Sequence, residues 1–249
     1  MQKERLDVLL LRKGLFATRA KAQAAIMAGK VRVEGRQDPK PGDLLRLETR
    51  IEVLKDAVPY VSRGGLKLAA ALDGFRVDPY GRLALDVGAS TGGFTDCLLQ
   101  RGAVKVYAVD VGHGQLDSRL RADPRVVCME RTHARDLTPA VFGTDDPSLD
   151  LAVMDVSFIS LAKVLTPVIA CLARPFDLIA LIKPQFELEP KKVPKGVVRR
   201  EEFRLEAVAS LRAFIASLPV AERGLLECPV KGAKGNVEFL WHLQDVRNK

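Results

Sequence analysis

The chain has 249 residues, 47% of them hydrophobic and 28% charged, and its formal net charge at pH 7 is +8. These proportions are close to the globular average and exclude a disordered or fibrous chain, while the length suits one or two domains. The four cysteines form no C-x-x-C pair and the three histidines are scattered, so we expect neither a zinc ribbon nor a structural metal.

The start of the chain carries charged side chains throughout and has no apolar core, so it does not predict a signal peptide. The longest mainly apolar stretch, Val164–Ala173, is half the length of a membrane span and contains Pro167. We therefore expect a cytoplasmic protein with reduced cysteines and no membrane partner.

Residues 1–50 have the pattern of a small α+β unit. A stripe of leucines predicts a helix over residues 3–16, and Thr18 is the expected N-cap of a second helix, Arg19–Ala28. Short strands are predicted at Val31–Val33 and Leu44–Leu47, with glycine and proline turns around them.

Part of this unit, Thr18–Gly35, resembles the S-four type RNA-binding domain, which is named after a small-subunit ribosomal protein. The resemblance implies that a basic helix face docks on structured RNA. The candidate RNA-binding residues are Arg5, Arg19, Lys21, Lys30 and Arg32.

Residues 51–60 have mixed charge and a closing proline and are predicted to be a linker. Over residues 61–249 strand and helix patterns alternate, which predicts right-handed βαβ units and a mostly parallel, doubly wound α/β sheet. Strands are expected at Leu83–Val87, Lys105–Val111, Arg125–Met129, Leu151–Val156, Leu178–Lys183, Gly224–Pro229 and Val237–Leu243. Helices are expected at Gly65–Leu72, Gly93–Arg101, Ile159–Leu172 and Glu201–Leu218.

The net charge is unevenly spread along these units. It is +5 over residues 1–60 and −3 over residues 86–180, and it returns to +4 over residues 181–249, which include the basic run Lys191–Arg200. Basic patches are typical of proteins that bind a polyanion, although ordinary scatter of surface charge would give a similar count.

The stretch Leu83–Phe94 joins an apolar strand to a glycine-rich turn and then to a helix. Such a turn lets the backbone approach a ligand closely, and the helix start offers free N–H groups. The spacing G-x-x-x-G-G is not the dinucleotide pattern G-x-G-x-x-G, which argues against NAD. Asp86 before the first glycine favours S-adenosylmethionine, and Asp110 after the next strand suits ribose hydroxyls.

Four further residues stand where a reacting group could reach such a cofactor. Asp155 and Lys183 close the fourth and fifth strands of this unit, Lys67 lies on its first helix, and Glu238 opens its last strand. Ligands of open α/β sheets bind at the carboxyl ends of the strands. A surface ion pair is the alternative reading for each residue alone. Lys183 follows an apolar run, so burial would lower its pKa and suit a general base, while nearby carboxylates would oppose that shift.

Six stretches, YVSRGGLKL, LDVGASTGGFTDCLL, AVDVGHGQL, MDVSFISL, LIKPQFE and KGNVEFL, together resemble the TlyA (hemolysin A) family of ribosomal RNA methyltransferases, which belongs with the FtsJ-like ribose 2′-O-methyltransferases. The resemblance implies a Rossmann-like class I methyltransferase domain with a seven-stranded sheet and S-adenosylmethionine as its cofactor. It implies a catalytic tetrad of Lys67, Asp155, Lys183 and Glu238. The candidate cofactor-binding residues are Asp86, Gly88, Ser90, Gly92, Gly93, Asp110 and Asp136.

The expected reaction is in-line methyl transfer to a ribose 2′-hydroxyl of ribosomal RNA, with family likeness suggesting cytidine. Lys183 is the expected base or alkoxide stabiliser. Asp155 and Lys67 would orient it and the ribose, and Glu238 would balance the charge. A noncatalytic RNA-binding assembly factor and a membrane-active hemolysin are the alternatives. The modified nucleotide, the ribosomal subunit and the oligomeric state stay open.

Two positions depart from the family pattern. The segment Val58–Val61 lacks the Arg and Trp of relatives, and His133 stands where many carry Asn. Base methylation is a less favoured alternative, because the sequence after the fourth strand is Asp155-Val-Ser-Phe, without the Pro-Pro of amino-group methyltransferases. Cys97 and Cys128 also lack the Pro-Cys context of a cytosine-directed nucleophile.

Overall fold

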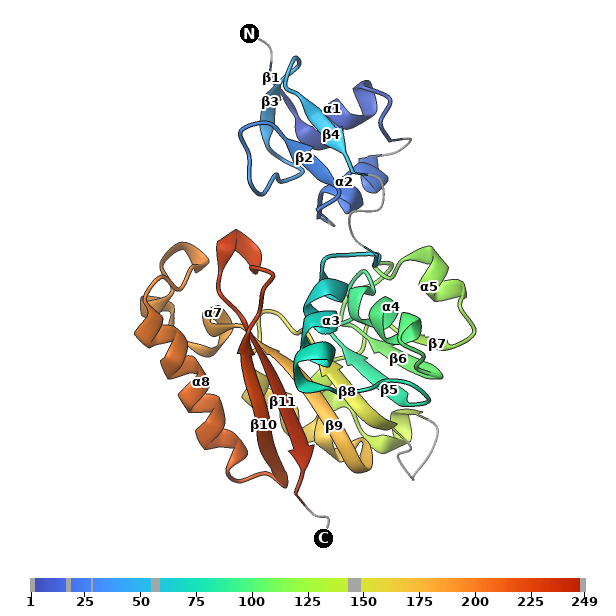
Figure 1. Cartoon of the computed structure of the whole chain (residues 1–249), viewed down its shortest axis with the longest axis vertical. Helices are drawn as coiled ribbons and strands as arrows, with labels where there is room; N and C mark the ends of the chain where they lie inside the picture. Colours follow the sequence, from blue (N-terminus) through green and yellow to red (C-terminus); the bar gives the residue numbers. More distant parts are fainter. Residues whose placement is uncertain (1–2, 17–18, 28, 55–58, 143–148, 247–249) are drawn as a thin grey trace.

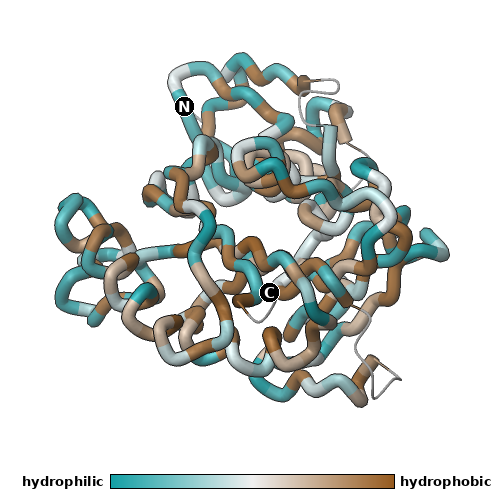
Figure 2. Tube along the Cα trace, turned by 60° about the horizontal axis from the view of Figure 1, so that its bottom comes forward, coloured by the Kyte–Doolittle hydropathy of each residue, from teal (hydrophilic) through white to brown (hydrophobic). Residues whose placement is uncertain are grey.

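The computed structural model describes residues 3–16, 19–27, 29–54, 59–142 and 149–246. They form a small N-terminal unit and a larger unit built on one sheet (Figure 1). Hydrophobic residues run through both units (Figure 2), and each unit has its own buried apolar cluster. No helix of the described residues has the length and apolar character that a membrane span needs.

The N-terminal unit packs two short helices against two antiparallel strand pairs, β1 with β3 and β2 with β4. Leu6, Leu9, Leu10 and Ile26 fill its core. Its elements are β1 (Lys3–Arg5), α1 (Leu6–Arg12), α2 (Arg19–Met27), β2 (Val31–Val33), β3 (Leu44–Arg46) and β4 (Ile51–Val53).

Two predictions for this unit are wrong at their edges. Residues 3–5 form a strand instead of the first turn of a helix, because they pair with β3. Ile51–Val53 forms β4 instead of starting a linker, since it pairs with β2 and its two apolar side chains pack on the core. The predicted N-cap Thr18 lies outside the described residues.

The larger unit contains a seven-stranded sheet in the order β10-β11-β9-β8-β5-β6-β7. Strands β5 to β9 are parallel, and β11 lies antiparallel between β9 and β10. The mostly parallel α/β fold that the sequence predicts is therefore confirmed. The strands are β5 (Leu83–Val87), β6 (Lys105–Val109), β7 (Val126–Met129), β8 (Leu149–Met154), β9 (Leu172–Ile182), β10 (Val220–Glu227) and β11 (Phe239–Asp245).

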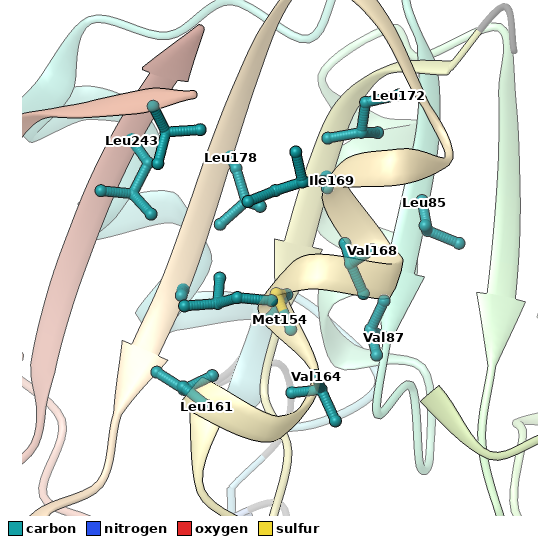
Figure 3. Packing of buried hydrophobic residues seen from close by; sticks show 14 of the residues in the cluster. Leu85, Val87, Met154, Leu161, Val164, Val168, Ile169, Leu172, Leu178 and Leu243 are labelled. Atoms are coloured by element: carbon teal, nitrogen blue, oxygen red, sulfur yellow. The ribbon is translucent and has the colours of Figure 1, made fainter. Parts of the chain in front are cut away.

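Helices cover both faces of this sheet, and β5 shows how one strand serves both. Its Leu85 and Val87 pack with Val164 and Val168 near α6 (Figure 3), while Ala84 packs in the opposite cluster with α3 and α4. A central parallel strand is buried on both sides in this way. The helices are α3 (Gly64–Phe75), α4 (Gly93–Gln100), α5 (Ser118–Ala122), α6 (Leu165–Ala170), α7 (Pro184–Glu187) and α8 (Glu201–Ile215).

The predicted helix Ile159–Leu172 is wrong in its extent. A 3-10 turn at Leu161–Lys163 is followed by the short helix α6, and β9 already begins at Leu172. Pro167 is the third residue of α6. A proline is tolerated in the first helical turn, where its missing N–H has no intrahelical acceptor, but not in the middle of a longer helix.

A polar cluster closes the edge of the sheet where the parallel strands begin. Asp177 on β9 accepts hydrogen bonds from Arg82 Nη1 (2.7 Å) and Gln244 Nε2 (2.8 Å), and its Oδ1 is 2.7 Å from His242 Nε2. Arg82 also bonds to Asp150. Burial favours a higher pKa for Asp177, but the bonds from His242, Arg82 and Gln244 outweigh it and hold that pKa well below its usual range.

Candidate active site

The functional candidates converge at the opposite edge, where the parallel strands end. Gly88 follows β5, Asp110 follows β6, Asp155 follows β8 and Lys183 follows β9. Two cavities open here. One has a volume of about 350 Å³, the other about 660 Å³, and they share Gly88, Ser90, Gln115, Asp155 and Ser157.

The smaller cavity lies over the ends of β5, β6 and β8. Its wall combines Val87 of β5 and Val109 of β6 with Ser90, Asp110 and Gln115. The Asp110 carboxylate accepts hydrogen bonds from the backbone N–H of Ser90 (2.8 Å) and of Gly112 (2.7 Å), so two loops fix its place in the wall. Apolar walls with a few fixed polar groups are typical of small-molecule sites.

The glycines of the turn after β5 have different roles. Gly88 has a φ of 87°, and a Cβ there would lie 2.7 Å from the carbonyl oxygen of Asp155, so only glycine fits between the two strand ends. A Cβ on Gly92 would meet Leu120 at 2.3 Å, and one on Gly93 would meet Ser62 at 2.2 Å. Gly88 and Gly93 line a cavity, whereas Gly92 lies outside both linings.

Asp86 is fully buried and lines neither cavity. Its Oδ2 accepts a hydrogen bond from Thr95 Oγ1 (2.6 Å), and its Oδ1 has no hydrogen-bond partner among the described residues. Burial raises the pKa of this carboxyl to about 7, with the charges of Asp155 and Asp110 adding to the effect while the bond from Thr95 opposes it.

This burial gives a pH-dependent stability. The folded chain holds the Asp86 proton up to about pH 7, while the unfolded chain loses it near 3.8. The free energy of unfolding therefore falls as the pH rises from 3.8 to about 7, by at most about 1.4 kcal/mol per pH unit. Above about pH 7 this group causes no further change. Asp86→Asn never ionises, so its stability relative to wild type is expected to rise from pH 4.5 to 7 in urea titrations without cofactor. A pH-independent difference would contradict the assignment.

The lining of the smaller cavity differs from the set of cofactor-binding residues that the sequence predicts. Asp136 lies exposed in the 3-10 turn Ala134–Asp136 and is not part of either lining. Its neighbours Thr132 and His133 do line the smaller cavity, as does Phe158. Only His133 had a sequence signal, its departure from the family pattern.

The four tetrad candidates form two ion pairs. Lys183 Nζ is 2.6 Å from Asp155 Oδ1 and donates to Ser157 Oγ at 2.8 Å. Lys67 Nζ donates to Glu238 Oε2 at 2.6 Å. The lysine side chains are 10% and 12% exposed. Burial disfavours the charged form of Lys67, but Asp155 and Glu238 outweigh it and raise its pKa, so Lys67 stays a cation.

The larger cavity lies between the two units, beside the tetrad. Lys67, Lys183 and Lys231 line it from the larger unit, and Lys40 lines it from the N-terminal unit. An ion pair of 3.6 Å between Arg63 and Asp38 joins the two sides. The lining holds five basic side chains against the three carboxylates Asp38, Asp117 and Asp155, so the cavity is cationic on balance. It meets the smaller cavity at Asp155 and Ser157.

The predicted RNA-binding residues of the N-terminal unit fall into two groups. Arg5 and Arg19, whose side chains are about half exposed, both donate to the buried carboxylate of Asp7, at 3.0 and 2.9 Å. These bonds, that from Arg5 first, keep the pKa of Asp7 far below its usual range although burial opposes them. Lys30 is half-buried and Arg32 is exposed, and the Lys21 side chain lies outside what the structure describes.

No cysteine stands among the residues that line the two cavities. All four cysteines are free, and burial raises the pKa of Cys97 to about 11. A buried, protonated thiol is a poor nucleophile. These observations disfavour the alternative of cytosine-carbon methylation.

A mostly parallel seven-stranded sheet with one reversed strand, a glycine turn after β5 and an acid after β6 define a Rossmann-like methyltransferase of the class that uses S-adenosylmethionine. The model of the FtsJ-like methyltransferase family matches residues 60–245, and the S4 domain model matches residues 4–51. The chain belongs to the FtsJ-like methyltransferase family, in the group that includes TlyA.

Several relatives are similar over nearly the whole chain. It is 45% identical to the 16S/23S rRNA (cytidine-2'-O)-methyltransferase TlyA of Mycobacterium tuberculosis, over 96% of this chain and 90% of the relative. It is 47% identical to the candidate rRNA methyltransferase YqxC of Bacillus subtilis, over 97% and 86%. A solved structure of a candidate hemolysin from Streptococcus thermophilus is 40% identical, with a TM-score of 0.77 over 100% of this chain and 90% of that one.

Proposed function

We propose that the chain transfers a methyl group from S-adenosylmethionine to the 2′-hydroxyl of a cytidine in ribosomal RNA. The observation that carries this proposal is the junction of two cavities at Asp155 and Ser157, one shaped for a small cofactor and one lined with lysines. A donor and a polyanion could meet only at their shared wall. The cytidine comes from the likeness to TlyA.

The residues of the smaller cavity fit the cofactor. The fixed Asp110 carboxylate suits the ribose hydroxyls of an adenosine, and Gly88 lets the ends of β5 and β8 lie close together under the cavity. When bound, S-adenosylmethionine supplies an electrophilic methyl group on a sulfonium.

The tetrad supports transfer by charge and alignment. As the ribose oxygen forms its new bond to the methyl carbon, the bond between that carbon and the sulfonium sulfur breaks, and the hydroxyl proton passes to solvent water. Negative charge develops on the ribose oxygen while its proton leaves. Lys183, the cation of the pair with Asp155, stabilises that charge, and Asp155 with Ser157 fixes its ammonium group. Lys67 with Glu238 holds a second cation at the cavity wall, where it orients the RNA backbone.

The test is transfer of a labelled methyl group from S-adenosylmethionine to ribosomal subunits that lack the modification, followed by mapping of the nucleotide. We expect a ribose-methylated cytidine whose 3′ linkage resists alkaline hydrolysis. Incorporation into a base, or into no RNA, would overturn the proposal. Tight RNA binding without incorporation would favour the noncatalytic assembly factor instead.

Phe158 follows Ser157 in the chain and is a candidate contact for an RNA base beside the junction. Its side chain is 90% exposed, its backbone has a left-handed φ of 63°, and its ring lies 5.0 Å from that of Phe186. A bulky residue in this conformation is strained, which is typical of functional positions. We expect Phe158 to stack on the target base.

Phe158→Ala is therefore expected to lower kcat/KM for RNA about 10-fold or more, because base–aromatic stacking contributes about 1–3 kcal/mol. Phe158→Trp is expected to retain most activity. Steady-state methylation with RNA as the varied substrate measures the effect. Because Phe158 also lines the cofactor cavity, the dissociation constant of S-adenosylmethionine is measured in parallel, and an effect confined to it would contradict stacking.

A further inference from the structure

Two short turns beside the tetrad repeat one unusual backbone. In the 3-10 turns Pro194–Gly196 and Ala233–Gly235, the lysine has a left-handed φ, 56° in Lys195 and 57° in Lys234, and the next glycine also has a positive φ. Such a backbone is uncommon for a lysine. We call this pair of turns the twin lysine turns. They follow α7 and β10 and extend toward the N-terminal unit (Figure 1).

The twin lysine turns bind each other directly. Lys234 Nζ donates a hydrogen bond of 2.8 Å to the carbonyl oxygen of Lys195. The same ammonium lies over the neighbouring glycine, since a Cβ on Gly196 would be 3.1 Å from Lys234 Nζ. One turn is therefore seated on the other.

The side chain of Asn236 is buried between the two turns and joins them. It is only 2% exposed, and its side-chain amide is used at both ends. Oδ1 accepts from the Val198 N–H (2.9 Å), and Nδ2 donates to the carbonyl oxygens of Gly196 (2.9 Å) and Ala233 (3.0 Å). An amide can make this set of bonds, whereas a carboxylate lacks both donors.

The same loop seats a tetrad residue. The Gly232 N–H donates to the Asn236 carbonyl oxygen at 2.8 Å. A Cβ on Gly232 would lie 1.9 Å from Glu238 Oε1, so the Glu238 carboxylate packs directly on this glycine. Glu238 in turn holds Lys67. A shift of the turns would thus move the Lys67–Glu238 pair.

The surface around the turns is basic. Lys195, Arg199 and Lys234 are exposed, and Lys231 lies at the rim of the cationic cavity. Lysines in such a cluster bind phosphate groups and release counterions. RNA is the polyanion that fits this place, because the cluster continues the cavity in which the tetrad stands.

We propose that the twin lysine turns form an RNA backbone contact of the larger unit, and that Asn236 is a positioning residue that ties this contact to the Lys67–Glu238 pair. The inference rests on the proposed RNA methylation. RNA phosphates seated on the turns would hold the loop, and the loop would hold Glu238 in place.

The test compares Lys195→Ala and Asn236→Asp with wild type on unmethylated ribosomal subunits. Lys195→Ala removes one phosphate contact, so KM for the subunits should rise about 3- to 10-fold, kcat should stay, and the salt dependence of binding should become shallower by about one ion. Asn236→Asp should raise KM and also lower kcat at least about 10-fold, with the cofactor dissociation constant unchanged. Lys105→Ala, at the opposite edge of the sheet, is the control.

Two results overturn the inference while the proposed function stands. One is wild-type KM and salt dependence in Lys195→Ala. The other is an Asn236→Asp enzyme whose only change is a lower active fraction, with KM and kcat per folded molecule intact. If Asn236→Asp does not fold, Lys234→Met tests the contact between the two turns instead and should raise KM for the subunits. A wild-type enzyme that methylates no RNA would instead overturn the proposed function.

Discussion

Lys183→Ala is expected to slow methyl transfer by about 10²- to 10⁴-fold while cofactor affinity changes little. The ammonium group stands at the wall between the cavities, paired with Asp155 at 2.6 Å, and does not line the smaller cavity. Loss of one group that stabilises developing negative charge has an effect within this range. Single-turnover methylation and calorimetric titration of S-adenosylmethionine measure the two quantities separately.

Two controls make the result specific to the position of the charge. Lys183→Arg keeps the charge but changes its shape, so we expect only partial activity. Lys105→Ala removes a lysine from the start of β6, at the opposite edge, and should leave turnover unchanged. Asp155 is already 22% exposed beside Lys183. Water can therefore reach the carboxylate that Lys183→Ala leaves unpaired, and the fold of this variant should persist. Near-normal turnover of Lys183→Ala would show that another group assists the hydroxyl.

Asp177→Ala is expected to lower the free energy of unfolding by about 3–5 kcal/mol, the largest stability effect we predict. The Asp177 carboxylate is 16% exposed, pairs with Arg82 and accepts bonds from His242 and Gln244. Its removal takes this acceptor from all three side chains and leaves Arg82 with its bonds to Asp150. Breaking a buried pair from one side has this cost. Urea denaturation at pH 7 measures it.

The same variant should keep its activity at temperatures where it is folded, because the cluster lies at the far edge of the sheet from the tetrad. Glu189→Ala, which removes an exposed carboxylate, should change stability by less than about 0.5 kcal/mol. Because the pKa of Asp177 is lower in the folded chain than its ordinary value of 3.8, the ionised carboxylate stabilises the fold at pH values above 3.8. This contribution to the free energy of unfolding is lost as the pH falls below that value. The difference between wild type and Asp177→Ala should therefore shrink in acid, and a constant difference would contradict it.

The sequence predicts the strand ends of this site well. Apolar runs define β5, β8 and β9, and Asp155 and Lys183 follow two of them directly. Parallel strands bring their carboxyl ends to one edge, so the meeting of these two residues follows from periodicity alone. The pair Lys67–Glu238 does not follow in that way. It depends on β11 being inserted antiparallel beside β9, which places Glu238 next to α3 across 171 residues of chain.

Other features needed the tertiary structure. A three-residue strand such as β4 has no periodicity to read, and only its pairing with β2 defines it. Asp86 reads as a cofactor contact from its place before a glycine, yet the packing of α4 buries it behind Thr95. The bonds of Asn236 join loops 40 residues apart, so local sequence carries no sign of them.

The pairing of β4 with β2 also limits the distance between the two units. With Val53 fixed in a strand, the chain from Leu54 to Pro59 has five peptide steps, which can span at most about 18 Å. An RNA held by the N-terminal unit is thus tethered near the tetrad, and a short tether gives an effective concentration in the millimolar range. Even weak binding of RNA by the N-terminal unit would then strongly favour its binding at the larger unit.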